Sequence, residues 1–195
     1  MSVPPSMTMR MQAAEALLAE RRPHWTRARF IQVAELGIFD RVELVRGELV
    51  EMSPQGPSHA NVIEILTEIL IPKLVGRART RVQLPLGLDD DTQVLPDLAI
   101  VDRASKRDDH PSSAILVIEV AESTKRYDTI VKGPLYADAR VQEYWIVDVP
   151  KRAVELYSAP RGGVFTKHSK VTKGELVVPR FDDVRIQLSD LFDRS

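Results

Sequence analysis

Two acids and a lysine stand out in this 195-residue sequence because their types and positions suit chemistry on a phosphate ester. Asp97 follows a proline at the start of an apolar segment that runs to Val101. Glu119 ends the apolar run that begins at Ile115, and Lys132 follows in a predicted helix. A buried carboxylate is costly unless it is paired, hydrogen-bonded or bound to a metal. Two strands that each carry one inward acid, with a lysine nearby, could hold a divalent cation against a phosphodiester.

Each of these three residues also has an ordinary structural explanation. The Pro96–Asp97 pair is typical of a loop residue that is solvated at the start of a strand. Glu119 could simply meet solvent where its strand ends. Asp128 and Lys132 are spaced four apart, which is typical of an ion pair on the surface of a helix. The sequence leaves these explanations open, although all three would have to hold together.

The pattern of apolar, turn and capping residues predicts one domain that combines helices and strands. In chain order we expect a helix from Thr26 to about Leu36, a hairpin at 42–52, a helix capped by Ser58, strands at 82–88, 94–101 and 115–120, a helix from Asp128 to about Ala139, strands at 144–148 and 154–157, and a last turn at 189–192. Gly133–Pro134 is expected to kink the helix that carries Lys132. The core order is therefore helix, three strands, helix, strand, in a domain of residues 24–195 behind an appendage of residues 1–23.

Composition limits the classes of function. The chain is 44% hydrophobic and 28% charged, contains no cysteine and has a formal net charge of −1. Without cysteine there are no disulfides or thiolate metal sites, which fits a cytoplasmic location. No apolar stretch approaches the length of a membrane span, and no secretory leader opens the chain. Because the net charge gives no overall attraction to nucleic acid, such binding would need a local basic patch or a metal that offsets the acids.

The order of these segments resembles the PD-(D/E)XK nuclease superfamily, which shares the restriction-endonuclease-like fold, and within it the Uma-two family of endonucleases. The resemblance covers about residues 25–190 and rests on short motifs: Gly37 to Val45, Gly47 to Pro54, Pro96–Asp97, Glu119 to Ser123, Tyr127–Asp128, Pro134 to Ala137 and Glu143 to Trp145. The usual superfamily lysine lies two residues after the second acid, where this chain has Ala121, so Lys132 would be a migrated lysine. The family commonly has glycine where Arg140 stands.

The resemblance implies an α+β domain with a mixed sheet flanked by helices, plus an added N-terminal helix and hairpin. It also implies a Mg²⁺-dependent endonuclease that hydrolyses phosphodiester bonds in DNA. Asp97 and Glu119 would bind the metal, with the Val120 carbonyl as a further ligand and Mn²⁺ as a possible substitute. Lys132 would orient the attacking water or stabilise the growing negative charge.

Two further residues are candidates for the same site. Glu43 matches the glutamate of the family's first motif and could ligate or orient the metal, but it could equally be a surface residue of the hairpin. His59 lies in the first turn of its helix, where it could contact a phosphate, orient a water or simply face solvent.

The assembly and the reaction both leave alternatives. Cleavage of both strands of a duplex needs two active sites, so we expect a homodimer. The apolar and aromatic content after Glu143, which includes Tyr144, Trp145, Tyr157 and Phe165, is enough to cover the core and leave a patch. The chain could instead be a non-catalytic nucleic-acid-binding or assembly module that retains the fold. A metal-dependent enzyme that acts on another phosphate ester is the third possibility, because a fold does not settle its substrate.

Overall fold

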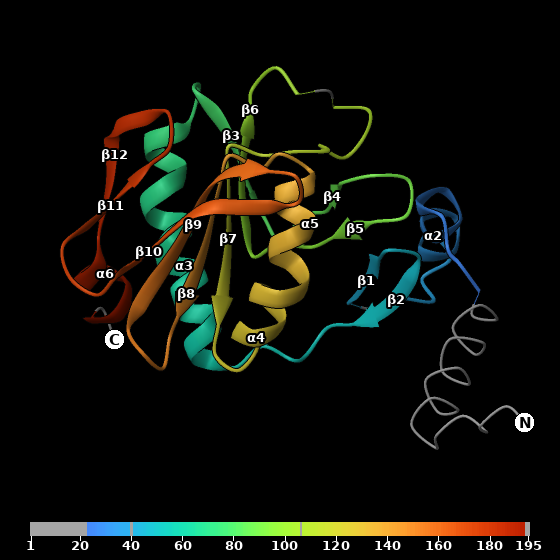
Figure 1. Ribbon diagram of the computed structural model, residues 1–195, viewed down its shortest axis with the longest axis horizontal. Coiled ribbons are helices and arrows are strands. Elements are labelled where there is room, and N and C mark those ends of the chain that lie inside the picture. Colours follow the sequence, from blue (N-terminus) through green and yellow to red (C-terminus); the bar gives the residue numbers. More distant parts are fainter. Residues whose placement is uncertain (1–22, 40, 106, 194–195) are drawn as a thin grey trace, which may run out of the picture.

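The computed structural model describes residues 23–39, 41–105 and 107–193, and a six-stranded sheet forms its centre (Figure 1). The strands are β3 (Ala78–Val82), β6 (Leu98–Asp102), β7 (Leu116–Ala121), β8 (Glu143–Asp148), β9 (Ala153–Arg161) and β10 (Val164–Val171). Their order across the sheet is β10–β9–β8–β7–β6–β3. Only the β7–β8 pair is parallel, so the described sheet is mixed. Every residue of β7 is buried, as its apolar run predicts.

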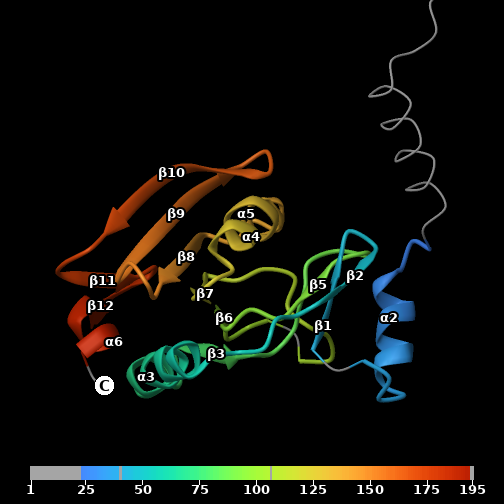
Figure 2. The ribbon, with the colours of Figure 1, turned by 90° about the horizontal axis from the view of Figure 1, so that it is seen from below.

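Helices cover both faces of this sheet (Figure 2). One face carries α3 (Pro57–Leu74), and the other carries a continuous helical segment of α4 (Lys125–Tyr127), the π-helical turn η1 (Asp128–Lys132) and α5 (Gly133–Asp138). Successive side chains of a strand point to opposite faces. Ile118 packs with the α3 side, and Val117 and Ala121 pack with the α5 side. Glu119 therefore faces the helical segment that carries Lys132.

A second, four-stranded sheet flanks the first. It has the order β2–β1–β5–β4 and is built from β1 (Val42–Val45), β2 (Glu48–Glu51), β4 (Leu86–Gly87) and β5 (Gln93–Val94). The helix α2 (Arg27–Ala34) lies beyond this sheet (Figure 2). At the other end of the molecule, β11 (Glu175–Val178), β12 (Phe181–Gln187) and α6 (Leu188–Asp193) lie near α3.

The predicted fold class and core order are confirmed. Helix α3, strands β3, β6 and β7, the helical segment α4–η1–α5 and strand β8 follow one another in the predicted order, with β4 and β5 inserted. The predicted N-terminal helix is α2, whose cap Thr26 accepts a hydrogen bond from the Arg29 amide at 3.3 Å. The predicted hairpin is β1–β2, and residues 149–152, which include the predicted turn at 150–151, join the antiparallel strands β8 and β9.

The predicted strand at 82–88 is wrong. The chain turns after Val82, because Gln83 has a left-handed φ of 49° and its amide donates to the Asp97 carbonyl at 3.0 Å. The strand lies earlier, as β3, and residues 86–87 join the second sheet as β4. The predicted strand at 94–101 is also wrong, because residues 93–94 form β5 and residues 98–102 form β6. Asp97 therefore sits in a bend directly before β6 rather than inside a strand.

Two predicted helix starts are also wrong. Gly56, not Ser58, is the N-cap of α3, and Pro57 takes the first helical position, where its missing amide costs no hydrogen bond. The helix of Lys132 begins at Lys125 instead of Asp128. Directly before Gly133–Pro134, where a kink is predicted, the helix contains the π turn η1, with the Gly133 amide bonded to the Asp128 carbonyl five residues earlier. Pro134 has no amide hydrogen, so an unbroken α-helical ladder cannot pass through it.

The aromatic residues after Glu143 cover the core, as their content predicts. Tyr144 and Trp145 are buried in the core. Tyr157 and Phe165 are partly buried and pack against the core on the α5 side. These four side chains therefore serve packing inside the domain and give no support to the predicted homodimer.

The predicted appendage, apart from Pro23, lies outside the described residues. Among the helices that the structure describes, none has both the length and the apolar character needed to cross a bilayer.

Arg140 provides a test of backbone strain at the end of the Lys132 helix, where its φ is 57°. A side chain in this left-handed region costs about 1–2 kcal/mol, while glycine loses about 0.5–1 kcal/mol in chain entropy. We expect Arg140→Gly to raise the free energy of unfolding in urea by about 0.5–1 kcal/mol. The matched control is Arg126→Gly in α4, which should lower it by a similar amount. A loss of stability in Arg140→Gly would contradict this explanation.

Candidate active site

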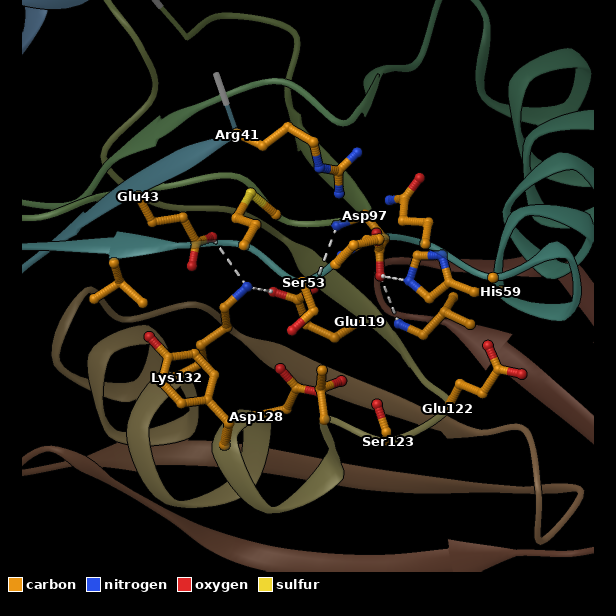
Figure 3. Close-up of a pocket in the computed structure, with 18 of the residues that line it drawn as sticks. Arg41, Glu43, Ser53, His59, Asp97, Glu119, Glu122, Ser123, Asp128 and Lys132 are labelled. Atoms are coloured by element: carbon orange, nitrogen blue, oxygen red, sulfur yellow. Dashed lines mark hydrogen bonds and ion pairs between the residues drawn. The ribbon is translucent and has the colours of Figure 1, made fainter. Parts of the chain in front are cut away.

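A cavity of about 300 Å³ lies between the β1–β2 hairpin, the start of α3 and the α4–η1 segment (Figure 3). Charged side chains from four parts of the chain meet there: Glu43, Asp97, Glu119, Asp128 and Lys132. Each of these residues is at most 5% exposed. Solvent exposure therefore does not explain Asp97 at its strand start or Glu119 at its strand end.

Lys132 lies between two carboxylates from different sheets. Its Nζ is 3.0 Å from Glu43 Oε1 and 3.0 Å from Glu119 Oε1. Burial by itself would lower the pKa of Lys132, but the charges of Glu119 and Glu43 outweigh burial and hold this pKa well above its usual value. The predicted alternative, a surface ion pair with Asp128, is wrong: Lys132 is buried, and Asp128 Oδ2 instead accepts a hydrogen bond from Thr124 Oγ1 at 2.7 Å.

Asp97 is held by hydrogen bonds on one oxygen. Its Oδ2 accepts the Val120 amide at 2.8 Å and lies 3.1 Å from His59 Nε2. His59 belongs to the first turn of α3, so this helix start is tied directly to the acid. The hydrogen bonds that Asp97 accepts from the described residues fall on Oδ2, which leaves Oδ1 for a ligand.

Glu119 has partners on both carboxylate oxygens. Oε1 accepts Lys132 Nζ at 3.0 Å and the Tyr136 hydroxyl at 2.7 Å, and Oε2 accepts the Asp97 amide at a long 3.4 Å. Burial raises the pKa of Glu119 to about 8, although the Lys132 charge opposes this shift; the Asp97 charge adds to it. Glu119 can thus gain or lose a proton, and its Oε2 accepts only the long hydrogen bond from the Asp97 amide.

Glu43 reaches the site from the second sheet. Its Oε1 accepts the Leu95 amide at 2.8 Å in addition to its contact with Lys132. Glu43 is 1% exposed, so the alternative of a surface hairpin residue is wrong. The β1–β2 hairpin is therefore part of the charged cluster.

Asp128, Tyr127 and Tyr136 were not predicted as site residues. Asp128 lines the cavity, and Tyr136 contacts the cluster through its hydrogen bond to Glu119. Asp128 and Tyr136 lie four positions on either side of Lys132, and that spacing is the signal that could have found them. Burial raises the pKa of Asp128. Tyr127 also lines the cavity, and the motif Tyr127–Asp128 of the family resemblance is the signal that could have found it.

The donor atoms suit a divalent cation that binds oxygen. When all four acids are ionised, the carboxylates of the cluster outnumber its one ammonium group. The Val120 amide points toward Asp97, and the amide and carbonyl of a strand residue point to the same side, so the Val120 carbonyl faces that side too. The described residues contain no group of three or more histidine or carboxylate side chains arranged around a metal. A cation here would use two carboxylates, a carbonyl and water, which is the usual preference of Mg²⁺.

Comparisons with known proteins point to the nucleases. The family model named Uma2 (the Uma-two family), described as "Putative restriction endonuclease", matches residues 32–188. Among solved structures, a "putative nuclease belonging to DUF820" from Anabaena variabilis superposes with a TM-score of 0.55 at 16% identity, covering 83% of this chain and 97% of that chain. The type IIG restriction endonuclease BpuSI has a TM-score of 0.37 at 13% identity, covering 70% of this chain and 14% of its own.

These comparisons differ in what they support. The Anabaena structure shows the fold alone, because its identity is low, and the BpuSI likeness is too weak to support an argument. A search of curated proteins finds no significant match. The family model, in contrast, spans most of the chain. The chain therefore belongs to the Uma2 family and has a restriction-endonuclease-like fold.

Proposed function

We propose that this protein is a metal-dependent endonuclease that hydrolyses phosphodiester bonds in DNA. The observation that carries the proposal is the meeting of Asp97, Glu119 and Lys132 in one cavity, although they come from the start of β6, from β7 and from η1. Membership in a family described as restriction endonucleases supports the nuclease class.

Asp97 and Glu119 would hold Mg²⁺, or Mn²⁺ in its place, with the Val120 carbonyl and water as further ligands. When bound, such an ion stabilises negative charge on the phosphoryl oxygens and lowers the pKa of a bound water. His59 would fix the orientation of Asp97 through the contact at 3.1 Å. Tyr136 would fix Glu119 in the same way through Oε1.

Lys132 would donate a hydrogen bond to the scissile phosphate or to the attacking water. Its ammonium group is charged and compact, which suits the stabilisation of charge that develops in the transition state. Glu43 holds Nζ from the side opposite Glu119, so we assign Glu43 a positioning role toward Lys132.

The test is a cleavage assay with duplex DNA, single-stranded DNA and RNA in Mg²⁺, in Mn²⁺ and in a chelator. We expect metal-dependent DNA cleavage that Asp97→Asn abolishes and that Lys132→Met lowers by a factor of about 100 or more. Lys167→Met, at an exposed lysine on β10, is the matched control and should cleave like the wild type. Binding of nucleic acid without cleavage in either metal would favour the non-catalytic module, and hydrolysis of small phosphate esters alone would favour the third possibility.

Two expectations stay predictions beside this proposal. A homodimer would place two active sites on a duplex, and light scattering at high protein concentration measures it directly. A cytoplasmic location rests on the absence of cysteine alone.

A further inference from the structure

Three tyrosines lie around the charged cluster, and one of them lacks a hydrogen-bond partner. The Tyr136 hydroxyl donates to Glu119 Oε1 at 2.7 Å, and the Tyr144 hydroxyl donates to the Asp128 carbonyl at 3.2 Å. The Tyr127 hydroxyl is buried and has no partner among the described residues. Buried polar groups are nearly always paired, so this hydroxyl calls for an explanation.

Tyr127 belongs to the same cavity as the catalytic candidates. Its side chain lines that cavity together with Asp97, Glu119 and Lys132. Burial raises the pKa of Tyr127 to about 12, and the Glu43 charge adds to this effect. The hydroxyl therefore keeps its proton at neutral pH and has a hydrogen that no described group accepts.

The π turn explains how Tyr127 and Lys132 come to the same cavity. They are five residues apart, and in a regular α-helix such side chains point about 140° away from each other. In η1 the hydrogen bonds span five residues, as the bond from the Gly133 amide to the Asp128 carbonyl shows. The wider turn brings positions five apart closer to one face, and π turns are frequent at functional sites.

We propose that Tyr127 is a substrate-contacting residue whose hydroxyl donates a hydrogen bond to a non-bridging oxygen of a phosphodiester bound beside Lys132. The neutral Tyr127 hydroxyl and the Lys132 ammonium group together suit an anionic phosphate oxygen. The substrate would then accept the hydrogen bond for which the protein provides no acceptor. The substrate class rests on the proposed function, whereas the unpartnered hydroxyl is independent of it.

The experiment compares Tyr127→Phe with Tyr136→Phe in the full chain. Affinity for a short labelled DNA strand is measured by fluorescence anisotropy in Ca²⁺. Turnover is measured in Mg²⁺, and the melting temperature is measured without metal. Tyr127→Phe should weaken DNA affinity about tenfold, which corresponds to loss of one hydrogen bond to a charged group. Its melting temperature should stay unchanged or rise, because no protein partner is lost. Tyr136→Phe, which loses the bond to Glu119, should melt at a lower temperature.

Each outcome decides the inference. Wild-type affinity in Tyr127→Phe would overturn it and leave an ordered water as the partner of this hydroxyl. A melting temperature lowered as far as in Tyr136→Phe would also overturn it, since the hydroxyl would then serve the fold. Failure of the wild type to bind the strand would do the same. If the wild type binds and Tyr127→Phe binds more weakly, but neither cleaves, the phosphate contact stands and only the endonuclease proposal fails.

Discussion

Replacement of Lys132 by methionine is expected to lower turnover by a factor of about 100 or more and to destabilise the metal-free protein by about 3–5 kcal/mol. Methionine keeps a similar aliphatic stem but removes the charge that Glu43 and Glu119 share at 3.0 Å each. Glu43 and Glu119 would remain buried without a cation, and protonation of Glu119 below about pH 8 would relieve only its own part of the unpaired charge. Loss of one partner from a buried ion pair is far more damaging than the loss of a surface pair, because the remaining charge stays desolvated.

Urea unfolding and cleavage rates measure the two effects separately. Lys167→Met on β10 is the control, and an exposed lysine should change stability by less than about 0.5 kcal/mol. The double variant Lys132→Met with Glu119→Gln should recover part of the lost stability, since one unpaired carboxylate is removed. A loss below about 1 kcal/mol, as for a surface pair, would contradict the buried role. Unchanged turnover in a folded Lys132→Met protein would contradict the catalytic role.

The second large effect concerns pH and metal. We expect Mg²⁺ or Mn²⁺ to raise the melting temperature only slightly at pH 6 and strongly at pH 8.5. The pKa of Glu119 is raised to about 8, mainly by burial, so below that pH the carboxyl holds a proton that a bound cation must displace. Above it the carboxylate is free to bind, and stabilisation follows from mass action.

Without metal, the contribution of Glu119 to the stability of the folded protein falls as the pH rises. The folded protein keeps the Glu119 proton up to about pH 8, whereas the unfolded chain releases it near the ordinary value of 4.5. The contribution of this group to stability is therefore fully present below pH 4.5 and is lost as the pH rises toward 8. The slope is at most about 1.4 kcal/mol per pH unit.

Thermal melts at several pH values, with and without metal, test both statements. Glu119→Gln should flatten the metal-free pH dependence and remove the metal response. Asp97→Asn should remove the metal response and could stabilise the metal-free protein by relieving repulsion. Glu68→Gln on the exposed side of α3 is the control and should behave like the wild type. An equal metal response at pH 6 and pH 8.5 would contradict the role of Glu119.

Local sequence pattern determined much of this fold. The apolar run before Glu119 predicted a central buried strand, and β7 is buried along its whole length. Capping and turn residues predicted α2 and the β1–β2 hairpin, because their conformational preferences act within a few residues. The family resemblance also selected Asp97, Glu119 and Lys132 as a set. What it could not do was separate a buried Lys132 from a surface ion pair, since spacing of four positions fits both.

Tertiary structure decided the rest of the site. Glu43 meets Lys132 only because the second sheet packs against the first, and no local preference encodes a contact between residues so far apart in the chain. The π turn depends on how the Gly133–Pro134 break is resolved against the sheet. Burial raises the pKa of Glu119 and leaves the Tyr127 hydroxyl unpaired, and burial is a property of the packed chain. The sequence thus specified which groups are present, and packing specified their charge, their partners and the cavity that they share.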